Sequence, residues 1–289
     1  MKEFAITTDS NSDLLQSYIK EKGIGIISHY YNLEGVTYGE DFVLSTKDFY
    51  DKMRQGMMPT TMASNPAVIR DTFQNYINQG FDVLHISFSS ALSGGYNNVA
   101  VGAMEICEEN PEAKIIVIDT LNVSLSQGMV IMKAVELREQ GMSIDEVAAW
   151  IEEHKLEYCV QFTVDDLFHL NRGGRVSKTK AIVGTMISIK PILVVNNNGE
   201  LVASGTTRGR KKSLMTIVDN MIANMGQYKV EDNVICVVHG DVEDDANFVV
   251  SLIKEKLHTD NIIVNSISPS IGAHSGPGAI GICYRGEHR

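Results

Sequence analysis

The chain has 289 residues and a formal net charge of -11, with 44% hydrophobic and 21% charged residues. This length allows a sizeable core and two domains, and the composition is typical of an ordinary soluble globular protein. The acidic balance argues against a dedicated nucleic-acid binder, because binding to a duplex depends largely on Lys and Arg side chains that neutralise phosphates.

Cysteine usage and the N-terminus indicate the compartment. Cys107, Cys159, Cys236 and Cys283 are far apart and three of them lie in apolar runs, so we expect buried thiols and no disulfide or metal site. The N-terminus has no long apolar signal segment, and no stretch approaches the length of a membrane span. We therefore expect a cytoplasmic protein.

The first half of the chain predicts repeated strand-helix units, which are typical of a parallel sheet flanked by helices. The segment from Pro59 to Pro66 is too rich in proline and hydroxyl groups to be predicted as a helix or a strand. Ser64 or Asn65 in this segment either caps the next helix or faces a ligand. The predicted strands are 4–7, 24–31, 83–86 and 115–119, and the predicted helices begin near 14 and 46 or span 67–77, 126–140 and 144–154.

One predicted strand ends in hydroxyl groups and glycines. The apolar run 83–86 is followed by the segment from Ser87 to Tyr96, which reads Ser-Phe-Ser-Ser-Ala-Leu-Ser-Gly-Gly-Tyr, and then by a helical pattern. The N-terminus of a helix directs unpaired backbone N–H groups and the positive end of its dipole at an anion. We therefore predict that Ser90 and Ser93 hold the negatively charged head of a ligand, at the carboxyl end of the strand.

The pattern changes near Tyr158. The apolar runs 187–195 and 201–206 are separated by Asn196-Asn197-Asn198-Gly199, a strong hairpin signal and therefore a sign of antiparallel pairing. We predict two α/β domains, residues 1–157 with a parallel sheet and residues 158–289 with a mixed sheet and helices. The other predicted elements of the second domain are strands 159–162, 234–238 and 262–267, and helices 164–170, 214–224 and 245–257.

Two basic segments stand out in this acidic chain. Arg172-Gly173-Gly174-Arg175 predicts a tight turn with both guanidinium groups projecting, which either supports the fold or binds phosphate as a backbone nest. The run 207–212, Thr-Arg-Gly-Arg-Lys-Lys, places positive charge where a helix begins and so opposes the helix dipole. This placement favours a charged partner over a merely solvated helix start.

His274 lies among Gly, Ala and Ser residues directly before Gly276-Pro277-Gly278, so a ligand can approach the backbone and the imidazole. A serine and a histidine together suggest a hydrolase, but the sequence has no Gly-x-Ser-x-Gly elbow. The histidines are dispersed and Cys-x-x-Cys is absent, so we expect no metal. Without a phosphate-binding glycine motif after a strand, we expect no nucleotide and no other cofactor.

These motifs, in this order, resemble the DegV family along essentially the full chain. Each motif alone is weakly specific, whereas the ordered set is specific. The motifs are Thr8-Asp9-Ser10, Ser64-Asn65-Pro66, the segment from Ser90 to Tyr96, Arg172-Gly173-Gly174-Arg175-Val176-Ser177, Ile189-Lys190-Pro191-Ile192-Leu193, Arg208-Gly209 with Lys211-Lys212, and His274-Ser275-Gly276-Pro277-Gly278.

The resemblance implies a two-domain α/β protein that binds a long-chain fatty acid and is not itself an enzyme. Family members of this kind act as the fatty-acid-binding (FakB-type) subunit of bacterial fatty acid kinase, in phospholipid metabolism. Such a subunit presents the carboxylate to a separate ATP-using subunit that forms the acyl phosphate. The resemblance also implies a peripheral contact with a membrane during lipid exchange.

Carried over residue by residue, the resemblance points to Ser93 and His274 as the residues that bind the carboxylate. The family commonly has Thr-Ser-Gln-Pro where this chain has Ala63-Ser64-Asn65-Pro66, so Thr61, Ser64 or a water is expected to replace the missing hydroxyl. Gly95 stands in place of a frequent threonine, and Ser275 replaces another threonine but keeps a hydroxyl. The complete expected sets are Ser93, His274, Ser64, Thr61, Ser90, Gly94 and Ser275 for the carboxylate, and Arg172, Arg175 and Arg208 for the kinase subunit.

Two other functions remain open from the sequence. Ser93 and His274 could serve a hydrolase or acyl transferase, which requires a base within hydrogen-bond reach of the serine. A helix-end anion site could equally serve a sensor of small anions or sugar phosphates, which a pocket too small for an acyl chain would favour.

Overall fold

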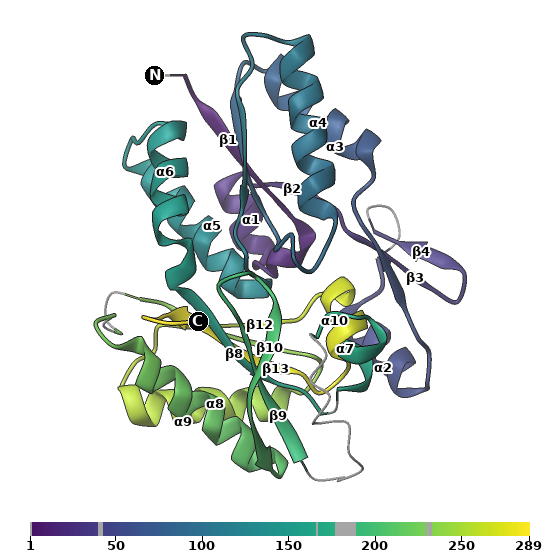
Figure 1. The fold of residues 1–289 in the computed structure, drawn as a ribbon, viewed down its shortest axis with the longest axis vertical. Helices are drawn as coiled ribbons and strands as arrows, with labels where there is room; N and C mark the ends of the chain where they lie inside the picture. The colour runs from purple at the N-terminus through teal and green to yellow at the C-terminus, as the bar shows by residue number, and fades with distance from the viewer. Residues whose placement is uncertain (1, 40–42, 166, 177–188, 229, 231–232) are drawn as a thin grey trace.

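The computed structural model describes residues 2–39, 43–165, 167–176, 189–228, 230 and 233–289. Two main sheets lie one above the other along the long axis of the molecule (Figure 1). The strands of the first all precede residue 120 and those of the second all follow residue 157. The boundary predicted between residues 157 and 158 stays a prediction.

The first sheet is parallel, with strand order β2-β1-β6-β7. Helices α3 and α4 pack on one face through Ile69, Phe73 and Val99, while α5 and α6 cover the other face. Its elements are β1 (Phe4–Asp9), α1 (Gln16–Lys22), β2 (Gly25–Ile27), α3 (Pro66–Asn78), β6 (Asp82–Ser87), α4 (Gly95–Glu109), β7 (Ile115–Asp119), α5 (Ser124–Glu139) and α6 (Ile144–His154), with a 3₁₀ turn at Ser10–Ser12.

The second sheet is mixed, with strand order β10-β9-β8-β13-β11-β12. Among the described strand pairs of this sheet, only β11–β12 is parallel, and the predicted hairpin joins β9 to β10. Helices α8 and α9 cover one face and α5 packs on the other, so α5 lies between the two main sheets. The elements are a 3₁₀ turn (Lys155–Glu157), β8 (Tyr158–Thr163), β9 (Ile189–Val195), β10 (Leu201–Arg208), α8 (Arg210–Met225), β11 (Ile235–His239), α9 (Glu243–Leu257), β12 (Ile262–Ser266) and β13 (Ile280–Arg285).

A third, three-stranded antiparallel sheet of order β4-β3-β5 was not predicted. It packs with α2 and α10 around Tyr31, Phe49 and Tyr50, beside the junction of the two main sheets, and α7 contacts α10 (Figure 1). Its elements and helices are β3 (Tyr30–Leu33), β4 (Val36–Tyr38), α2 (Thr46–Arg54), β5 (Thr60–Met62), α7 (Phe168–Arg172) and α10 (Pro269–Ser275).

The small sheet explains two wrong predictions. The run 24–31 is not one strand, because the chain leaves the parallel sheet after Ile27 and enters the small sheet at Tyr30. The segment 59–66 contains β5, whose residues pair with β3. Independently of the small sheet, the helix predicted over 164–170 begins only at Phe168.

The α/β architecture and the parallel-then-mixed order of the sheets are confirmed. The four cysteines are free, and all but Cys107 are buried. Residues 187 and 188 of the predicted hairpin and Ser177 of the arginine motif lie outside the described residues. Among the described helices, none combines the length and hydropathy that a bilayer-spanning segment needs.

A buried carboxyl group lies where the N-terminal and C-terminal elements meet. The backbone N–H of Ser268 donates to Oδ1 of Asp13 over 3.0 Å, and the hydroxyl of Ser124 also donates to this carboxyl group. The side chain of Asn265 donates to the backbone carbonyl of Asp13 over 2.8 Å. Burial raises the pKa of Asp13 to about 7, because its cost to the charged form exceeds the effect of these hydrogen bonds.

We expect the free energy of unfolding to depend on pH through Asp13. Since its pKa is about 7 in the folded protein against 3.8 for a free side chain, the folded state retains a proton that the unfolded chain loses. Stability should therefore fall as the pH rises from 4 to 7, by up to about 1.4 kcal/mol per pH unit. In the neutral Asp13→Asn variant, the free energy of unfolding, measured by urea denaturation at several pH values, should depend less steeply on pH.

The control is Asp71→Asn on the exposed side of α3. Its free energy of unfolding should depend on pH as steeply as that of the unsubstituted protein. Equal slopes in Asp13→Asn and in the unsubstituted protein would contradict a raised pKa for Asp13.

Candidate functional site

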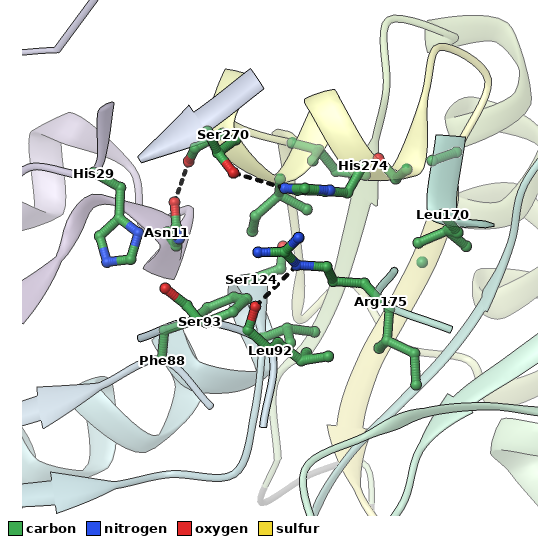
Figure 2. Close-up of a pocket in the computed structure, with 18 of the residues that line it drawn as sticks. Asn11, His29, Phe88, Leu92, Ser93, Ser124, Leu170, Arg175, Ser270 and His274 are labelled. Atoms are coloured by element: carbon green, nitrogen blue, oxygen red, sulfur yellow. Dashed lines mark hydrogen bonds between the residues drawn. The ribbon is translucent and has the colours of Figure 1, made fainter. Parts of the chain in front are cut away.

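A cavity of about 270 Å³ lies where the two main sheets and the small sheet meet. Most of its lining is apolar and comes from strands of the second sheet, the loop before α4 and the start of α10. Polar side chains from several elements face the same space (Figure 2). The apolar lining includes Phe88, Leu92, Val123, Val160, Phe162, Leu170, Leu201, Val238, Ile267, Ile271, Ala279 and Ile280, and the polar lining is Asn11, His29, Thr61, Ser93, Ser124, Arg175, Ser270, His274 and Ser275.

Ser93 lies at the N-terminus of α4, as predicted. The helix begins at Gly95, and the Oγ atom of Ser93 accepts the Gly95 N–H over 3.1 Å. This hydrogen bond uses Oγ as an acceptor, so the hydroxyl proton of Ser93 is available to a ligand in the cavity. Together with the dipole of the 15-residue helix, it makes this wall of the cavity favourable to negative charge.

His274 reaches the cavity from α10 and pairs with Thr61 from β5. The Nε2 atom of His274 lies 2.8 Å from Oγ1 of Thr61. Nδ1 has no hydrogen-bond partner among the described residues, and a Cβ atom built on Gly173 would lie 2.2 Å from it. Burial, together with the charges of Arg175 and Arg172, lowers the pKa of His274 to about 4, so the imidazole is neutral at pH 7.

The two arginines of the Arg-Gly-Gly-Arg turn do not project freely, so that prediction is wrong. Arg175 lines the cavity, and its guanidinium group donates to the carbonyl of Leu92 over 3.1 Å and to that of Gly173. Arg172 donates to the carbonyls of Pro59, over 2.9 Å, and Ala273, over 3.2 Å. The turn therefore ties α7 to the loop that carries Ser93 and to α10, which carries His274, and it brings one positive charge to the cavity.

The structure brings five of the seven predicted carboxylate residues to the cavity: Ser93, His274, Thr61, Gly94 and Ser275. Ser64 is buried outside the lining, and its hydroxyl has no hydrogen-bond partner among the described residues. Ser90 also lies outside the lining, with its N–H donated to Asp119 Oδ1 over 3.2 Å. Of the two hydroxyls that could replace the one missing at Ala63, only that of Thr61 faces the cavity.

Four polar residues of the lining were not predicted: Asn11, His29, Ser124 and Ser270. Asn11 directly follows Thr8-Asp9-Ser10, and Ser270 begins the small-residue stretch around His274. Both residues therefore adjoin motifs identified from the sequence. His29 lies between β2 and β3 in a run that resembled one apolar strand. A histidine within this apolar run was the sign in the sequence that the strand is interrupted there.

Comparison with known proteins identifies the family. Residues 3–287 match a family model described as "Uncharacterised protein, DegV family". A DegV domain-containing protein of Clostridium perfringens is 37% identical over 289 residues, covering 99% of each chain. This chain belongs to the DegV family.

Solved structures of other DegV proteins have the same fold. A DegV family protein from Thermus thermophilus, described by its fatty acid binding, is 28% identical with a TM-score of 0.88, and covers 99% of this chain and 100% of its own. A fatty-acid-binding DegV family protein of Streptococcus agalactiae is 25% identical with a TM-score of 0.88 over all of both chains. DegV of Bacillus subtilis, described as a fatty acid binding protein, is 26% identical with a TM-score of 0.84, covering 99% and 100%.

The packing of His274 on Gly173 predicts the effect of a single methyl group. In Gly173→Ala the new Cβ atom would lie 2.2 Å from His274 Nδ1, so the imidazole or α7 must move. We expect a loss of about 1–3 kcal/mol in the free energy of unfolding, measured by urea denaturation. Gly205→Ala in β10, where a Cβ atom meets nothing within 4 Å, should change it by no more than about 0.5 kcal/mol. Equal stability of the two variants would refute this packing.

Proposed function

We propose that this DegV protein binds a long-chain fatty acid in the cavity between its main sheets. The carboxylate lies among Ser93, Thr61, His274 and Arg175, and the acyl chain follows the apolar lining. The observation that carries this proposal is one cavity in which a helix N-terminus and a guanidinium group adjoin a mostly apolar wall. The fatty-acid-binding DegV structures from three other bacteria support it.

The positive charge of Arg175 offsets part of the free-energy cost of burying a carboxylate in this cavity. A carboxylate that loses its hydration without a partner costs several kcal/mol, and hydrogen bonds to a charged group recover part of that cost. Arg175 is the one Lys or Arg side chain among the described lining residues, while His274 is neutral at pH 7 and acts through a hydrogen bond. The acyl chain adds about 0.8 kcal/mol for each CH₂ group that leaves water.

The two other functions have less support. A hydrolase needs a base on the serine, but Ser93 Oγ accepts from the Gly95 N–H and His274 Nε2 lies against Thr61. A sensor for small anions would need a polar cavity, whereas Leu92, Phe162 and Val238 belong to an extensive apolar lining. Both observations favour a carrier that binds its ligand without transforming it.

We further propose that the protein presents the carboxylate to a separate ATP-using kinase subunit in the cytoplasm. The resemblance to fatty-acid-binding subunits of this kinase is one support. The second is an exposed basic cluster, Arg208, Lys211 and Lys212, at the end of β10 and the start of α8. Arg210 between them donates to the carbonyl of Gly278 over 2.6 Å, which joins the basic segment to the loop after His274.

Removing the Ser93 hydroxyl should weaken fatty-acid binding. A hydrogen bond to a charged group is worth about 1.5–3 kcal/mol, so we expect Ser93→Ala to reduce the affinity for oleate about tenfold or more in isothermal titration calorimetry. Ser90→Ala, in the same loop but outside the cavity lining, is the matched control and should bind as the unsubstituted protein does. Equal affinities of the two variants would place the carboxylate elsewhere.

Reversing the charge at Arg208 should separate binding from presentation. Because Arg208 is exposed and outside the cavity lining, we expect Arg208→Glu to bind oleate normally but to lower its phosphorylation by the kinase subunit about tenfold or more, by introducing a like-charge contact with an acidic partner. Arg70→Glu, an exposed charge reversal on α3, should leave turnover unchanged. Normal turnover of Arg208→Glu would exclude this contact.

A further inference from the structure

A second histidine faces the cavity, opposite His274 and beside Ser93 (Figure 2). His29 occupies the bend between β2 and β3, where only 8% of its surface is exposed. Its backbone N–H donates to Ser10 Oγ over 2.9 Å, and its ring packs at a tilt against Phe88 with the ring centroids 6.3 Å apart. The hydrogen bond holds the backbone of His29 in place, and the contact with Phe88 holds its ring.

Asn11 determines which nitrogen of His29 carries the proton. The Asn11 amide oxygen accepts from the hydroxyl of Ser270, so the NH₂ group of the same amide donates to His29 Nδ1, over 3.0 Å. Burial lowers the pKa of His29, which keeps the ring neutral. A neutral ring that accepts at Nδ1 carries its proton on Nε2. Nε2–H is thus a hydrogen-bond donor.

This donor lies close to Ser93 and Gly95, on a side chain that lines the cavity. A Cβ atom built on Gly95 would lie 2.8 Å from His29 Nε2 and 3.3 Å from Ser93 Oγ, so both atoms border the space that a side chain at residue 95 would occupy. No described residue accepts a hydrogen bond from Nε2, although His29 is more than nine-tenths buried. A donor without a protein acceptor, on a mostly buried side chain that lines the cavity beside Ser93, indicates an acceptor supplied by the ligand.

We propose that His29 is a head-group residue of the fatty-acid site, donating Nε2–H to the carboxylate oxygen that Ser93 also binds. This inference rests on the proposed function and adds a residue to it. Ser93 and His29 bind one side of the head group, and Thr61 with His274 bind the other. Ser270, on α10, holds Asn11 and so sets the orientation of a histidine on the other side of the cavity.

The test compares two ligands that differ only in the head group, oleate and oleyl alcohol, by titration calorimetry. The variants are His29→Leu, which removes the donor, and His29→Gln, whose side-chain NH₂ group can replace Nε2–H. We expect His29→Leu to lose about tenfold or more in affinity for oleate but at most a few-fold for the uncharged alcohol. His29→Gln should recover most of the oleate affinity. Gly95→Ala should lose oleate affinity as His29→Leu does, because the methyl group displaces Nε2.

The outcomes distinguish this inference from the proposed function. If the unsubstituted protein binds neither ligand, the proposed function fails and the inference with it. If it binds oleate and His29→Leu binds equally well, or loses both ligands equally, only the assignment of His29 is overturned.

A measurement on the unsubstituted protein avoids any effect of substitution on folding. In long-range ¹H–¹⁵N spectra of histidine-labelled protein, His29 should show the Nε2–H tautomer, with a proton shift downfield on addition of oleate and a smaller shift with oleyl alcohol. A proton on Nδ1, or a resonance that oleate leaves unchanged, would overturn the assignment.

Discussion

The carboxylate of Asp9 organises the N-terminal wall of the cavity. It accepts the backbone N–H of Asn11 over 3.0 Å and that of Phe88 over 2.7 Å, together with the side-chain amide of Gln127 over 3.2 Å. Asn11 lies in the 3₁₀ turn after β1, Phe88 directly follows β6 and Gln127 lies in α5, so a single buried group connects three parts of the chain. Asn11 then orients His29, and Phe88 begins the loop that carries Ser93. The positions of Ser93 and His29 on this wall therefore follow from Asp9.

The cavity combines one positively charged group, the guanidinium of Arg175, with two neutral imidazoles, those of His29 and His274. Burial, together with the charges of Arg175 and Arg172, lowers the pKa of His274. The histidines can then donate to a carboxylate or pair with a hydroxyl without themselves adding charge to the buried site. Such an arrangement limits the number of charged side chains that folding must bury around the cavity.

The sequence predicted those parts of the site that depend on neighbours along the chain. Ser93 could be found because a strand, a small-residue loop and a helix follow one another directly. The pairing of Thr61 with His274 joins residues 213 positions apart, and only tertiary structure shows that Thr61, rather than Ser64, reaches the cavity. His29 was hidden because apolar neighbours on both sides resembled one strand. The arginine turn was misjudged because local sequence does not show which carbonyl groups surround a guanidinium.

Helix α5 is shared by both main sheets, and most of its residues are buried. Neither half of the chain therefore closes its core without the other: residues 1–157 alone would expose the side of α5 that packs on β8, β11 and β13, and residues 158–289 alone would lose the cover of that sheet. Contacts between elements so distant in sequence form late and slowly. The two halves should accordingly unfold as one cooperative unit, with the cavity assembled only when the whole chain has folded.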